Sequence, residues 1–230
     1  MILTAHQPVY LPWLGLFHKI QNADLFCYFD IVQYQRKDYN NRNKIKTSNG
    51  ELWLSVPVES KGHLNKNVSE ILIIQDNWVK KHLKSIELNY KKTLFFQDYF
   101  PELESILINE SQNSLGILNL KLLKFFMKCL GIVTPIVKAS DYSFNGVGSE
   151  LVLDMCIKLG ADSYIFGEQG KNYANINAFT EENILVEFQN YIHPVYNQVG
   201  RTFLPYMSIV DLLFNEGEKS FDILMLNNIG

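Results

Sequence analysis

The sequence predicts an α/β fold with a largely parallel, Rossmann-like sheet, flanked by helices and extended by additional C-terminal helices and strands. Short apolar runs bounded by turn residues, such as 2–5 and 25–30, are typical of buried strands. Stretches with helical periodicity, such as 13–22, separate those runs, and this alternation favours parallel pairing. No linker rich in Pro, Gly and Ser interrupts the chain, so we predict one domain over residues 1–230.

The individual elements follow from periodicity and from the residues that end each run. Pro12 suits the first turn of the helix over 13–22. Residues 51–58 alternate between apolar and polar side chains, which predicts a strand. The leucine-rich helix over 114–130 stops before Gly131, which suits a helix end. We predict further strands at 70–74, 133–137, 162–166 and 184–188, and further helices at 78–90, 101–109, 147–159 and 208–216.

Composition narrows the class of protein. The 230 residues carry a formal net charge of -3, which gives no overall reason to expect nucleic acid or an anionic membrane as a partner. No apolar run has the roughly 18–20 residues of a membrane span, and the N-terminus lacks a signal-peptide pattern, so we expect a cytoplasmic protein. The three cysteines form no CxxC pair, and no metal-ligand spacing occurs, so we expect neither a metal nor a resident cofactor.

Three polar segments, 6–13, 30–46 and 167–173, follow predicted strands. Ligands of open α/β sheets bind beyond the carboxyl ends of the strands, so we expect these segments to meet in one cleft. His6 is the candidate catalytic residue, because an imidazole with a near-neutral pKa can act as a general base. It could equally bind the ligand or cap a backbone group.

Aromatic and amide side chains supply the candidate binding residues of the first segment. Tyr10 and Trp13 offer rings that can stack on a sugar or a base, and Gln7 can read hydroxyl groups. The alternative for Trp13 is that it anchors its helix in the core.

The second segment contains Gln33 and then a cationic stretch rich in asparagine, residues 36–46. Arginine and lysine suit phosphate or carboxylate, so we expect a single anionic ligand, such as a diphosphate or an acyl carrier. A solvated loop is the alternative. The candidate binding residues of the stretch are Asn41, Arg42, Asn43, Lys44 and Lys46.

Two candidate binding residues remain, one outside the three polar segments and one at the end of the third segment. His82 shares a helical stripe with Trp78 and is more typical of a core histidine, although neighbouring lysines keep a binding role open. Tyr173 flanks the loop over 167–171, whose glycine spacing differs from that of a Walker A loop. We include His82 and Tyr173 as candidate ligand contacts.

The chain resembles the WbqC-like protein family in motifs spread over its whole length. The most distinctive are the HQPxYLPWLG motif at residues 6–15 and the NRNxIK motif at 41–46. The WLxVPV motif at 53–58 and the SIxDLL motif at 208–213 also match.

The resemblance implies a role in bacterial surface-polysaccharide biosynthesis, because this family is associated with O-antigen (lipopolysaccharide) gene clusters that also encode enzymes for nucleotide-linked amino sugars. We add the hypothesis of an N-acyltransferase that modifies such a sugar by acyl or aminoacyl transfer. The partners would be the nucleotide-linked sugar and an acyl donor or carrier, with acyl-CoA or another activated acyl donor as cosubstrate. The alternative is a non-catalytic module that binds a sugar nucleotide or assists a partner enzyme.

Overall fold

The computed structural model describes residues 1–59, 61–62 and 65–226, and its centre is a five-stranded sheet of entirely parallel pairs. The α/β prediction is therefore confirmed. The strand order is β5-β2-β1-β6-β7. The strands span Ile2–His6 (β1), Leu25–Tyr28 (β2), Ile136–Lys138 (β5), Ser163–Phe166 (β6) and Leu185–Phe188 (β7).

The central strand β1 pairs with β2 on one side and with β6 on the other. The chain first builds the sheet outward through β2 and β5, and then crosses to the opposite side for β6 and β7. The order thus reverses between β1 and β6, and such switch points are where doubly wound sheets bind ligands.

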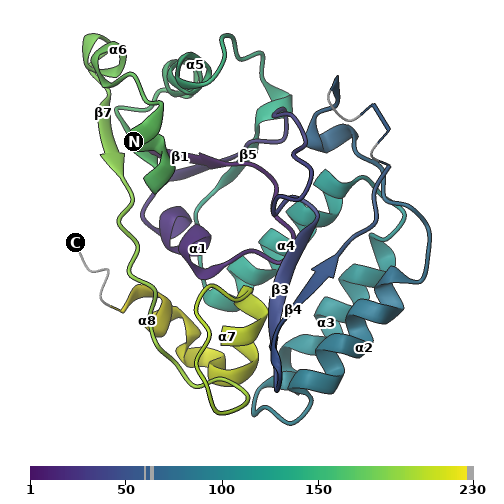
Figure 1. Cartoon of the computed structure of the whole chain (residues 1–230). Coiled ribbons are helices and arrows are strands. Elements are labelled where there is room, and N and C mark those ends of the chain that lie inside the picture. The colour runs from purple at the N-terminus through teal and green to yellow at the C-terminus, as the bar shows by residue number, and fades with distance from the viewer. Residues whose placement is uncertain (60, 63–64, 227–230) are drawn as a thin grey trace.

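Alternating side chains of the sheet enter two separate apolar cores. Leu3, Ala5 and Cys27 face the smaller core, which is covered by helices α5 (Ser149–Leu159) and α6 (Ile176–Glu181). Phe26 and Tyr28 face the larger core, on the side of α1 (Leu14–Gln21) and α4 (Leu115–Leu130). Figure 1 shows these helices on opposite sides of the sheet.

The remaining elements extend the larger core. An antiparallel hairpin, β3 (Arg42–Thr47) and β4 (Gly50–Ser55), packs against α2 and α7. The helices on this side are α2 (Trp78–Tyr90), α3 (Phe96–Asn109), α7 (Ile209–Glu216) and α8 (Ser220–Met225).

Three local predictions differ from the structure. The strand predicted at 70–74 is wrong, because Leu72 and Ile73 form only isolated bridges after a short 3-10 turn. The cationic stretch, read as a polar segment, contains strand β3. Helix α3 begins at Phe96 and not at residue 101.

Within the described part of the chain, no helix is long and apolar enough to cross a membrane. The same residues contain no cluster of His, Cys, Asp or Glu that could hold a metal ion. Cys27 and Cys156 are buried free thiols, and burial raises the pKa of each to about 12.

Candidate functional site

A cleft of about 470 Å³ lies at the carboxyl ends of β1, β6 and β7, at the point where the strand order reverses. This volume suits a small-molecule ligand. The lining residues are His6, Gln7, Trp13, Gly15, Leu16, Lys19, Asp38, Tyr39, Gly167, Glu168, Gln169, Gln189, Tyr191 and Tyr206.

All three polar segments that follow strands contribute to this cleft, as the sequence predicts. The first supplies His6, Gln7 and Trp13, the second supplies Asp38 and Tyr39, and the third supplies the turn over 167–169. Hydrogen bonds join the first two segments directly: the Tyr10 N–H donates to the Tyr39 carbonyl at 3.0 Å. The meeting of the segments in one cleft is therefore confirmed.

His6, at the end of β1, presents one ring nitrogen as an acceptor. Its Nδ1 lies 2.8 Å from the Gln7 carbonyl, which can only accept, so Nδ1 carries the proton and Nε2 has a free lone pair. Burial, and then the charge of Lys19, lower the pKa of His6 to about 3. The expected near-neutral pKa is thus wrong: His6 is neutral at physiological pH and a weak base.

Lys19 is a cleft residue that the sequence analysis did not select. It lies on α1, its side chain is buried, and Nζ donates to the Ala5 carbonyl at 2.9 Å. Burial lowers its pKa to about 8, much nearer neutrality than that of His6. The only signal in the sequence is a lysine among the apolar residues of a buried helix.

An aromatic row runs from the cleft to the hairpin. The ring centroids of His6 and Trp13 are 5.3 Å apart, as are those of Trp13 and Tyr39. Tyr39 then contacts Trp53 of β4 at 5.8 Å. Trp13 therefore lines the cleft and also packs against the larger core, so both readings of this residue hold in part.

The outer wall of the cleft comes from residues 189–207, a segment without helix or strand that we call the strap. Gln189, Tyr191 and Tyr206 of the strap line the cleft. Gln189 Nε2 donates to the Gly15 carbonyl at 2.8 Å, and a Cβ on Gly15 would lie 3.0 Å from Tyr191. Glycine at position 15 thus allows the strap to approach α1 closely.

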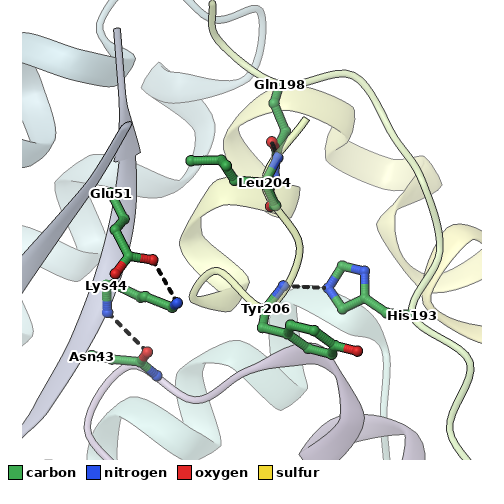
Figure 2. Close-up of polar contacts among 7 residues, drawn as sticks. All are labelled: Asn43, Lys44, Glu51, His193, Gln198, Leu204 and Tyr206. Carbon is green, nitrogen blue, oxygen red and sulfur yellow. Dashed lines mark hydrogen bonds and ion pairs between the residues drawn. The ribbon is translucent and has the colours of Figure 1, made fainter. Parts of the chain in front are cut away.

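The strap holds Tyr206 in a strained backbone conformation. Its φ of 60° is left-handed, which is unfavourable for a tyrosine. Figure 2 shows its N–H donating to Nε2 of His193, at 3.1 Å. Gln198 braces the same turn through two hydrogen bonds with the Leu204 backbone.

Three cations of the asparagine-rich stretch, Arg42, Lys44 and Lys46, lie on the hairpin and do not line the cleft. The Arg42 guanidinium stacks on Trp53, with Cζ 4.6 Å from the ring centroid. Lys44 pairs with Glu51 at 2.6 Å, as Figure 2 shows, and Lys46 is almost fully buried. The aromatic row therefore connects the cleft to Arg42 and Lys44 but not to Lys46.

The asparagines of this stretch bind backbone groups of the protein itself. Asn43 is fully buried and donates to the Leu11 carbonyl at 2.7 Å, and Asn41 donates to the Val56 carbonyl at the same distance. Neighbouring Asn40 donates to the Pro8 carbonyl. Leu11 has a φ of 45°, so these contacts hold a strained turn in place.

The other candidate residues lie away from the cleft. Tyr10 is fully buried, and its hydroxyl meets Nδ1 of the buried His82 at 2.8 Å. Gln33 pairs with Asn67 in a loop, and the half-exposed Tyr173 packs on Phe166. The binding roles of these residues remain predictions.

The cleft combines neutral, acidic and cationic groups. Asp38 accepts from Gln7 Nε2 at 3.2 Å, Glu168 is exposed, and the buried Tyr191 hydroxyl oxygen has no hydrogen-bond partner in the described residues. Among the described residues that line the cleft are two carboxylates and one ammonium, that of Lys19, together with aromatic rings. Such walls suit a polar ligand with a ring and a basic group.

Comparison with known proteins places the chain in a family. The model of the WbqC-like protein family matches residues 7–223. The chain belongs to this family. It is also 35% identical to an uncharacterized protein of Mycobacterium tuberculosis over 219 residues, which are 95% of each chain. No solved structure matches the chain.

Proposed function

We propose that the protein is an enzyme of bacterial surface-polysaccharide biosynthesis that transfers an acyl or aminoacyl group to the amine of a nucleotide-linked sugar. The observation that carries the proposal is the cleft, because it places a histidine acceptor, two carboxylates and aromatic rings around one ligand-sized space. The proposal also draws on the family's association with genes for nucleotide-linked amino sugars.

The carboxylates of the cleft suit the amine of an amino sugar. Asp38 and Glu168 would accept from a sugar ammonium and its hydroxyl groups, while the ammonium of Lys19 leaves room for one anionic group in the same cleft. The sugar ring would pack on Trp13, whose ring lies between those of His6 and Tyr39.

The nucleotide would extend along the aromatic row toward the hairpin. Arg42 and Lys44 both approach the Trp53 ring, at 4.6 and 5.8 Å from its centroid, and offer cations for the diphosphate. Lys46 is buried close to Asp211, so it would lie behind the surface that the nucleotide contacts.

In the proposed reaction the sugar ammonium first loses one proton to water, and the free amine then attacks the carbonyl carbon of the activated acyl donor. The new C–N bond forms, the bond from the acyl carbon to its carrier breaks, and the carrier leaves with the electron pair of that bond. His6 Nε2 accepts the proton that the nitrogen loses, and the leaving carrier is then protonated. A bound anionic group would offset the charge of Lys19, which is the second cause of the low pKa of His6 after burial, and would therefore raise that pKa.

The test is to incubate the protein with pairs of nucleotide-linked amino sugars and acyl-CoA or aminoacyl donors, and to analyse the small molecules by mass spectrometry. The expected result is a sugar nucleotide heavier by one acyl group, in amounts that depend on His6. Unchanged donors and sugars across the panel would refute the transferase.

One observation favours a second candidate, a non-catalytic module that binds the same sugar nucleotide. The pKa of His6, about 3, keeps the ring neutral, so Nε2 can accept a hydrogen bond from a ligand but is a weak base. Tight binding of a sugar nucleotide without conversion of any donor pair would select this alternative.

A further inference from the structure

The side chain of Lys19 is buried at the inner end of the cleft with few partners. Its exposed fraction is 4%, and its one hydrogen bond goes to the Ala5 carbonyl. An ammonium has three N–H donors, so two of them have no acceptor in the described part of the chain. Burying an ammonium is strongly unfavourable unless a partner compensates the charge.

No carboxylate of the described residues forms an ion pair with Lys19. Asp38 is a half-buried carboxylate of the cleft, but its two oxygens accept from Gln7 Nε2 and from the Tyr39 N–H. Glu168 is exposed. The neighbour His6 is neutral and supplies no charge.

A purely structural role does not require a charge at this position. Bracing the β1 carbonyl needs only a neutral donor, such as the amides that Asn40 and Asn43 provide for Pro8 and Leu11. Burying a charged lysine is less favourable than burying an amide, and an anion in the cleft would compensate for that charge.

We propose that Lys19 is the anion-binding residue of the cleft and pairs with a carboxylate or phosphate group of the ligand. Its ammonium points from α1 toward the carboxyl end of β1, so the anionic oxygen would lie beside His6. The inference deepens the proposed function by assigning an anionic group to one substrate, but the site itself can be tested without any turnover.

The experiment measures thermal stabilisation by sodium phosphate and by sodium acetate, each against sodium chloride at equal ionic strength and pH 7. At least one of the two anions should raise the melting temperature of the wild type. Lys19→Arg should keep that rise, while Lys19→Gln, which retains a donor but no charge, should weaken anion affinity at least tenfold. The two anions distinguish a phosphate from a carboxylate ligand.

Lys124→Gln is the matched control, because it removes the same charge from the exposed face of α4 and should respond as the wild type does. The melting temperature without added anion shows that each variant is folded. Equal anion responses in the wild type and Lys19→Gln, or no response to either anion in the wild type, would overturn the proposal. Absence of acyl transfer with a Lys19-dependent anion response would refute the transferase and leave this site standing.

Discussion

The histidine-proline opening (residues 6–13) and the C-terminal part of the asparagine-rich stretch (residues 40–46) both carry polar side chains, yet the fold uses these side chains in opposite ways. His6, Gln7 and Trp13 direct their side chains into the cleft. Asn40, Asn41 and Asn43 turn inward and bind backbone carbonyls. A polar side chain just after a strand is free to meet a ligand, whereas an asparagine beside a strained turn is needed to hold it.

The largest expected effect tests whether His6, which faces the cleft, takes part in the reaction. His6→Ala should reduce turnover by about 10²- to 10⁴-fold, the usual contribution of a general base, while ligand binding stays within a few-fold. Single-turnover assays and calorimetry measure the two quantities. Added imidazole should restore part of the rate. A parallel loss of binding and turnover would make His6 a binding residue only.

The pH dependence of the free energy of unfolding tests the buried part of the histidine-proline opening, where Tyr10 contacts His82. Burial lowers the pKa of His82 to about 4, below its ordinary 6.5, so the unfolded chain takes up the proton first. The contribution of His82 to stability is therefore complete above pH 6.5 and declines as the pH falls toward 4, by up to about 3 kcal/mol.

Urea unfolding at several pH values checks this prediction. The pH dependence between 6.5 and 4 should be shallower in His82→Gln than in the wild type. Identical slopes in the two proteins would show that other groups govern the acid response.

The next effect tests whether the asparagines support the opening. Asn43→Ala leaves the buried Leu11 carbonyl without its donor, which should reduce the free energy of unfolding by about 2 kcal/mol. The neighbouring Lys44→Gln removes only a partly exposed ion pair and should cost less than about 1 kcal/mol. Comparable losses in the two variants, measured by urea titration, would contradict the distinction between bracing and surface residues.

The smallest effect concerns the cations that remain on the hairpin surface. Arg42→Gln should weaken binding of uridine diphosphate by about threefold, because a partly exposed charge contact contributes little in water. The loss should shrink at high salt, and binding of a free amino sugar should stay unchanged. Calorimetry at two salt concentrations measures the affinity of the wild type and of Arg42→Gln for uridine diphosphate. Unchanged affinity at low salt would place the nucleotide elsewhere.

The sheet could be predicted because local patterns determine it. Apolar runs such as 25–30 and the periodic helix at 78–90 carry their own signals, and the ends of the strands then place His6 beside residues 167–169. Strand β3 was missed because its cations and asparagines obscure its alternating burial.

The details of the site were less accessible because they depend on distant neighbours. Nothing near Lys19 in the sequence shows that its ammonium meets the carbonyl of Ala5, or that it lowers the pKa of His6. The strap residues Tyr191 and Tyr206 enter the cleft through a segment with no periodic pattern, so sequence reasoning had no basis for selecting them.

The strap leaves the sheet at Gln189, whose N–H donates to Phe166, and rejoins the fold at Ser208, whose N–H donates to Lys44. Tyr196 and Met207 of the strap are buried, and Tyr196 donates to Asp211, but the other strap residues can change in composition while the parallel strands keep their pairing. Ligand preference in this architecture can therefore evolve separately from folding, and exchanging the segment between homologues is a direct route to altered selectivity.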